Sequence, residues 1–120
     1  MAYNQAFYPM GKTFVLSGSS TLATSNVFAD SPCSQYLFVN HETSGSQPLY
    51  VRISATSGAN AAVPTSGTPG YGVPIRPQES LVLSGPQCSS SSNVFISYIS
   101  SSGTPTVYVT PGEGLSLIHI

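Results

Sequence analysis

Side chains that could catalyse a reaction or bind a metal are scarce in this sequence. Proton transfer and metal coordination draw largely on carboxylates and imidazoles, and the chain supplies only Asp30, Glu42, Glu79, Glu113, His41 and His119. His41 and Glu42 are adjacent, so in an extended segment they point to opposite sides and are poorly placed to chelate one ion. Neither histidine belongs to an HExxH pattern or accompanies paired CxxC units. The sequence therefore predicts no metal site.

Nucleophile and phosphate-binding motifs are also missing. With 22 serines in the chain, a combination of Ser, His and Asp carries no information, and the GxSxG motif of a nucleophile elbow does not occur. The stretch GTPGYG lacks the strand-to-helix setting and the lysine of a phosphate-binding loop. We therefore expect a protein that is not an enzyme and that uses no cofactor.

The low charge of the chain limits the classes of molecule that it could bind. Charged residues are 6% of the sequence, against about 25% in an ordinary soluble domain. Lys12, Arg52 and Arg76 are too few and too dispersed to bind a nucleic-acid backbone. The two arginines are expected either to pair with Glu42, Glu79, Glu113 or a partner's carboxylate, or simply to be solvated. Because a net charge of −1 gives little repulsion between molecules, we expect this protein to pack closely against other protein molecules.

The cellular compartment in which the chain folds determines whether its two cysteines begin as thiols or as a disulfide. No stretch has the pattern of an export signal, and the apolar runs are far shorter than the ~20 residues of a membrane-spanning helix. We therefore expect synthesis in a cytoplasm and no membrane association, with Cys33 and Cys88 beginning as thiols. Each cysteine lies just before a predicted strand, so the two meet if those strands are neighbours. A disulfide and a pair of buried thiols both remain open.

Strand signals dominate the rest of the chain, because β-branched and aromatic residues cluster in short runs separated by Gly, Pro, Ser and Asn. No stretch has a sustained helical period. The pattern predicts a single-domain, all-β antiparallel sandwich, jelly-roll or immunoglobulin-like, over residues 13–120. Its eight expected strands are Thr13–Ser17, Leu22–Phe28, Gln35–Asn40, Leu49–Ser54, Ser80–Ser84, Asn93–Ser100, Thr106–Thr110 and Leu115–Ile120.

Alternation along the strands predicts which side chains face the core. In LYVRI, Leu49, Val51 and Ile53 are expected inside, and in TVYVT, Val107 and Val109. The run VFISYIS is apolar on both faces, so a loop, an arm or another subunit should cover its second face, which carries Phe95 and Ile99. The predicted strands Asn93–Ser100 and Thr106–Thr110 are expected to form a hairpin, with Gly103 in its loop available for a positive φ. The sequence PGEG is expected to end the second of these strands.

Two segments do not fit a compact sandwich. Residues 1–12 lack strand alternation and are expected to form an extended arm that orders against a partner through Tyr3, Phe7, Tyr8 and Met10, the alternative being a frayed terminus. Residues 55–77 form a long Gly/Pro-rich loop in which Tyr71, Val73 and Ile75 are expected to be buried together. Loops of this length are usually either functional or flexible. The candidate partner contacts are therefore Tyr3, Phe7, Tyr8, Met10, Tyr71, Phe95 and Ile99.

Four stretches carry a family resemblance: MAYNQAFYPMGKT at the start, SQYLFVNH, GYGVPIRPQESLVLSGPQ, and NVFISYISSSGTPTVYVTPGEG near the end. In these stretches the chain resembles small β-structured accessory proteins of tailed-bacteriophage virions. Where such proteins usually have Pro-Gly-Glu, this sequence has Pro77, Gln78 and Glu79. The resemblance is one of general sequence pattern over most of the chain. It rests on no invariant catalytic or ligand-binding motif and assigns no binding residues.

What the resemblance implies is a structural role in a virion. The expected function is that of a capsid decoration or cement protein, which binds the major capsid protein or other virion proteins and bridges capsomers, as a homo-oligomer and most simply a trimer. A neck, tail or fibre component is the first alternative. A glycan-binding module with Tyr50, Tyr71 or Tyr108 as stacking platforms is the second.

Overall fold

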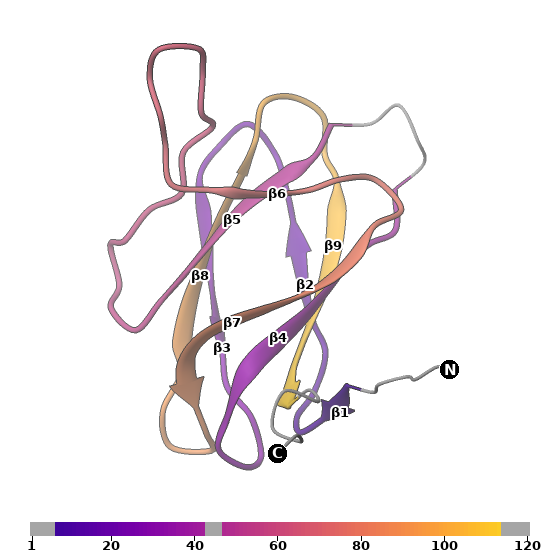
Figure 1. Cartoon of the computed structure of the whole chain (residues 1–120), viewed down its shortest axis with the longest axis vertical. Helices are drawn as coiled ribbons and strands as arrows, with labels where there is room; N and C mark the ends of the chain where they lie inside the picture. The colour runs from indigo at the N-terminus through magenta and orange to yellow at the C-terminus, as the bar shows by residue number, and fades with distance from the viewer. Residues whose placement is uncertain (1–6, 43–46, 114–120) are drawn as a thin grey trace.

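The computed structural model describes residues 7–42 and 47–113, which form a β-sandwich (Figure 1). Within these ranges there is no helix, and hence none that could cross a membrane. The strands are β1 (Tyr8–Pro9), β2 (Phe14–Ser17), β3 (Ala23–Val27), β4 (Cys33–Asn40), β5 (Leu49–Ser54), β6 (Val73–Ile75), β7 (Ser80–Cys88), β8 (Val94–Ser100) and β9 (Thr106–Glu113). The predicted all-β sandwich fold is confirmed.

The strand order identifies the type of sandwich. The first sheet has the order β2-β9-β4-β7, with β1 paired to the far end of β9, and the second has the order β3-β8-β5-β6. Strand β2 pairs with β9, β3 with β8, β4 with β7 and β5 with β6, always antiparallel. This is the pairing of one long hairpin rolled up into two sheets. Of the two sandwich types expected, the chain therefore has the jelly-roll arrangement.

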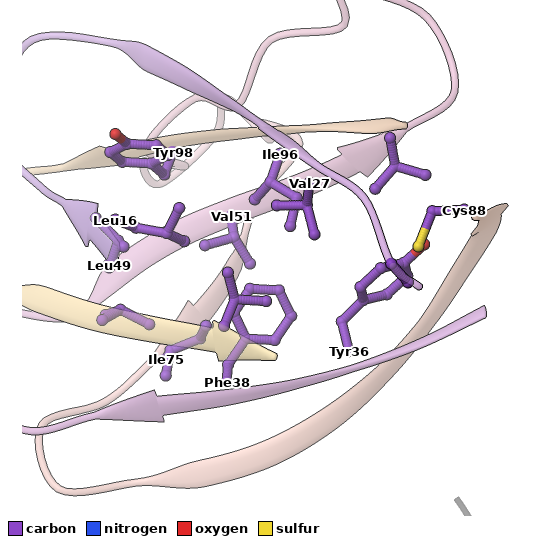
Figure 2. Close-up of a cluster of buried hydrophobic side chains, with 14 of the residues drawn as sticks. Leu16, Val27, Tyr36, Phe38, Leu49, Val51, Ile75, Cys88, Ile96 and Tyr98 are labelled. Atoms are coloured by element: carbon purple, nitrogen blue, oxygen red, sulfur yellow. The ribbon is translucent and has the colours of Figure 1, made fainter. Parts of the chain in front are cut away.

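The core lies between the two sheets and is built by alternate side chains of each strand (Figure 2). Tyr36 and Phe38 of β4 are fully buried, and Leu49 and Val51 of β5 face them from the second sheet. The inward positions predicted for β5 and β9 are therefore correct, with Ile53 half-buried at the edge of the cluster. One buried polar residue also joins the sheets, because Asn40 Nδ2 of β4 donates a 2.9 Å hydrogen bond to the Ile75 carbonyl of β6.

The expected hairpin of the last two strands is wrong. Strand β8 belongs to the second sheet and β9 to the first, so the loop between them crosses from one sheet to the other. Gly103 in this loop does have a positive φ of 77°. Strand β9 also continues through PGE to Glu113, although PGEG was expected to end it. The predicted strand Leu115–Ile120 lies outside the described residues.

The end of the predicted arm folds onto its own sandwich. Tyr8 and Pro9 pair with Glu113 and Gly112 of β9, and the Met10 N–H donates a 2.9 Å hydrogen bond to the Pro111 carbonyl. The Met10 side chain packs against the core cluster. The expectation that residues 8–10 order only against a partner is therefore wrong, because the extended end of β9 supplies backbone partners. Residues 1–6, with Tyr3, lie outside the described residues.

The long loop after β5 is shorter than expected, because Val73–Ile75 forms strand β6 on the edge of β5. Of the group expected to be buried, only Ile75 is, while Tyr71 and Val73 are exposed. The following turn has Pro77 and then Gln78 with a φ of 60°, and the Glu79 N–H donates to the Arg76 carbonyl. These are the features of a type II turn. Gln78 thus takes the left-handed conformation for which glycine is better suited.

Candidate binding surface

The outer surface of the first sheet is an apolar face that we call the first-sheet face. It consists of Val15 of β2, Leu37 and Val39 of β4, Val82 of β7 and Tyr108 of β9. Val15 is 52% exposed, Val82 44% and Tyr108 38%, while Leu37 and Val39 are half-buried between neighbouring strands. These residues face outward because the alternate positions of the same strands fill the core. These five apolar side chains therefore remain partly accessible to water.

The strand register makes this face continuous. Val15 lies opposite Tyr108, and Tyr108 lies opposite Val39. In the next row, Leu37 lies between Thr110 and Val82. With neighbouring strands about 4.8 Å apart, the apolar residues extend about 14 Å across four strands. A scattering of single apolar residues on a surface is ordinary, but a contiguous patch is typical of an interaction site.

No charge interrupts the first-sheet face. The outward positions of β2, β4, β7 and β9 around the five apolar residues carry hydroxyl and amide groups, namely Ser17, Gln35, Ser80, Ser84, Thr106 and Thr110. Beside it, the Thr13 and Thr110 hydroxyls form a 2.7 Å hydrogen bond. A hollow of about 400 Å³ at the end of β4 is lined by Val39, Asn40, His41, Gln78 and Ser80. The face is thus uncharged and rimmed by hydroxyls, which suits a dry protein contact with a polar rim.

The outer surface of the second sheet is covered differently, by the loop that follows β5. The Ala61 N–H donates a 2.8 Å hydrogen bond to the Ser97 hydroxyl in the middle of β8, and both residues are buried. Phe95 and Ile99, which flank Ser97 on the same side of the strand, are half-buried. Of the covers expected for the second face of VFISYIS, the structure supplies a loop. Phe95 and Ile99 are therefore less available for a partner than the first-sheet face.

Arg52 anchors this loop instead of pairing with a carboxylate. Its guanidinium lies 3.9 Å from the centroid of the Tyr71 ring, and its Nη1 donates a 3.2 Å hydrogen bond to the Asn60 carbonyl. The Tyr71 carbonyl accepts a hydrogen bond from the Ala62 N–H. The ring itself is 68% exposed and borders two shallow hollows of about 220 and 320 Å³. A stacking contact thus holds an exposed aromatic ring in place.

Of the other predicted contact residues, those that the structure describes lie at the far end of β9, in the first sheet, whereas Tyr71, Phe95 and Ile99 belong to the second sheet and its loop. Phe7 lies against Gly112 of β9, Met10 packs on the core, and Tyr8 is 69% exposed at the end of the first sheet. The structure therefore does not gather the predicted contacts into one site. It shows instead a face that sequence reasoning missed, although QYLFV, like VFISYIS, has apolar residues at both inward and outward positions.

The three glutamates of the chain have backbone partners. Carboxylate oxygens of Glu42, Glu79 and Glu113 accept hydrogen bonds from the backbone N–H groups of Thr106, Arg76 and Ser34, respectively. Glu79 also forms a 3.7 Å ion pair with the exposed Arg76. Within residues 7–42 and 47–113, no three His, Cys, Asp or Glu side chains lie close enough together to hold a metal ion. His119 lies outside these ranges.

Comparisons of this chain with protein-family models, with curated proteins and with solved structures find no match.

Proposed function

We propose that the protein is a structural virion component that attaches to the outer shell of a capsid through the first-sheet face and stabilises contacts between capsomers. The observation that carries this proposal is the contiguous, uncharged apolar surface of Val15, Leu37, Val39, Val82 and Tyr108. Burial of such a surface on another protein is favourable by about 25 cal/mol per Å² of apolar area. Salt should also change the affinity of such a contact only slightly, because salt screens interactions between charges and this contact contains none.

The family resemblance is the reason to propose a capsid as the partner. The four stretches that resemble phage accessory proteins favour a virion location. We also propose that the protein is a homo-oligomer on the shell. The jelly-roll arrangement is compatible with this role but does not select it, because capsid and lectin domains both use the fold. A neck, tail or fibre position would use the same face against a different virion protein.

The proposal predicts stoichiometric binding to a particle. Purified protein, added to capsids of the encoding phage assembled without it, should sediment with them and saturate at a fixed number of copies per capsid. The amount bound should change less than two-fold between roughly 50 and 500 mM salt, because charges contribute little to the contact. Quantitative mass spectrometry of gradient fractions measures both properties. Protein that stays at the top of the gradient at every concentration would contradict the proposal.

A second candidate function is glycan binding, favoured by the fixed and exposed ring of Tyr71. One side of the ring rests on Arg52, and the ring borders a hollow lined by Pro69 and Gly70. Aromatic rings offer a flat apolar surface on which the C–H groups of a sugar can stack. Of the other two expected platforms, Tyr108 belongs to the first-sheet face and Tyr50 is half-buried against Gly72.

If this second candidate is correct, Tyr71→Ala should lower affinity for the bound sugar at least ten-fold, because it removes the stacking surface. A panel of neutral oligosaccharides, titrated by calorimetry against the whole protein, would identify the sugar. Tyr8→Ala is the matched control, since Tyr8 is 69% exposed and Tyr71 68%, and it should bind as the parent does. Equal affinities for parent and Tyr71→Ala, or no binding across the panel, would dismiss the glycan function.

A further inference from the structure

Cys33 and Cys88 lie directly opposite each other inside the sandwich. Cys33 begins β4, Cys88 ends β7, and they are register partners across the antiparallel pair. Their Sγ atoms are 3.8 Å apart, and neither residue is exposed. Cys88 lies at the Tyr36 end of the core (Figure 2). The two free thiols are thus in van der Waals contact, with no side chain between them.

We propose that Cys33 and Cys88 are a built-in oxidation site, at which a thiol–disulfide oxidant converts the two thiols into a disulfide that ties β4 to β7. In this reaction one thiolate attacks the oxidant disulfide and releases one reduced thiol. The second cysteine then attacks the mixed disulfide and releases the other. Two S–H bonds and the oxidant's S–S bond are broken, one protein S–S bond forms, and the oxidant leaves as two thiols. The proposal is independent of the proposed function.

The backbone is already placed for this bond. Directly opposed residues of an antiparallel pair have Cα atoms about 4.5 to 5.5 Å apart, and disulfides span Cα separations of about 4.4 to 6.8 Å. The two sulfurs therefore need only side-chain rotation to approach bonding distance. The register shift between Cys33 and Gln35 separates the cysteine pair from the regular ladder that follows, so a small local adjustment need not disturb the remaining pairs.

Burial makes the reaction slow in the folded protein. It raises the pKa of the Cys33 thiol to about 12, with the neighbouring Cys88 adding to the shift. Since the thiolate is the attacking species, oxidation depends on brief opening of the strand ends that carry the two residues. A reducing compartment would keep the pair as thiols, and passage to an oxidising one would close it. The bond would close a loop between residues 55 positions apart, which restricts the unfolded chain.

The test treats the whole reduced protein with oxidised glutathione over a series of temperatures up to its melting temperature. We expect the mass to fall by that of two hydrogen atoms, the free-thiol count after denaturation to go from two to zero, and the melting temperature to rise by on the order of 10 °C. A reductant should reverse all three changes.

The single variants Cys33→Ala and Cys88→Ala serve as controls, because each retains one thiol and cannot form the internal bond. Under the same treatment neither should show the rise in melting temperature. Persistence of two free thiols in the parent up to its melting temperature would overturn the proposal. A parent that carries two glutathione adducts, or dimers linked between molecules, would overturn it as well. The parent experiment decides the matter even if a variant fails to fold.

Discussion

Phe38→Ala is expected to cost about 3 to 5 kcal/mol of unfolding free energy. Phe38 lies on β4, between β7 and β9 in the middle of the first sheet, and no part of it is exposed. Its ring packs between the sheets (Figure 2), so truncation would leave a cavity that the two sheets cannot fill without moving together. Against a total stability of about 5 to 15 kcal/mol, this is a large loss. Urea unfolding followed by circular dichroism measures it.

Leu37→Ala is the matched control for this substitution. Leu37 is the preceding residue on the same strand but points outward, half-buried on the first-sheet face. Its truncation is expected to cost about 1 kcal/mol, because solvent already reaches the site. Similar costs for the two variants would contradict the inward and outward positions assigned to β4.

Local alternation is the part of this fold that the sequence predicts well. In LYVRI and TVYVT the inward and outward positions follow from the two-residue period of a strand, which depends only on neighbours along the chain. The composition of the loop SSGTP predicts that Gly103 is available for a positive φ, because glycine has no Cβ, and Gly103 has a φ of 77°. All-β architecture follows from many such strands with short turns between them.

Strand pairing depends on contacts between distant parts of the chain, so local sequence patterns predict it less well than they predict the strands themselves. The segment SSGTP between β8 and β9 suits a hairpin as well as a crossing between sheets. The choice between them is made because β5 and β3 occupy the two edges of β8, while β4, β1 and β2 occupy those of β9. Similarly, β1 forms only because the far end of β9 extends to Glu113 and offers an unpaired edge.

The first-sheet face could not be assembled from the sequence for the same reason. Its five residues come from four strands that are distant along the chain, and only their register brings Val15 beside Tyr108 and Leu37 beside Val82. One local signal was present, namely the apolar residues on both faces of QYLFV. That signal indicates that the outer side of β4 is apolar, but not which neighbouring strands complete the patch.

Val82→Glu is expected to abolish most attachment to the capsid while leaving the fold intact. The side chain is 44% exposed, so a carboxylate there remains hydrated in the free protein. In the proposed contact the same carboxylate would be buried without a partner, which is strongly unfavourable. We expect at least a ten-fold loss of affinity, equivalent to about 1.4 kcal/mol. The unfolding free energy should change by less than about 1 kcal/mol.

Val73→Glu provides a close control for the charge itself. Val73 is 43% exposed and, like Val82, belongs to an edge strand, but its strand β6 lies in the second sheet, and Val73 lines a hollow at the edge between the two sheets, with Leu83 and Ser84 of β7. The two variants therefore introduce the same charge at nearly the same exposure, one within the first-sheet face and one outside its five apolar residues. A general effect of added negative charge on binding would appear equally in both.

The most direct test of a capsid-binding first-sheet face is co-sedimentation of the parent, Val82→Glu and Val73→Glu with phage capsids that lack the protein. Bound protein is quantified over a range of concentrations to give a dissociation constant for each variant. If the first-sheet face binds the capsid, the parent and Val73→Glu bind equally and Val82→Glu binds at least ten-fold more weakly. Equal binding by Val82→Glu and the parent, or an equal loss in Val82→Glu and Val73→Glu, would contradict it.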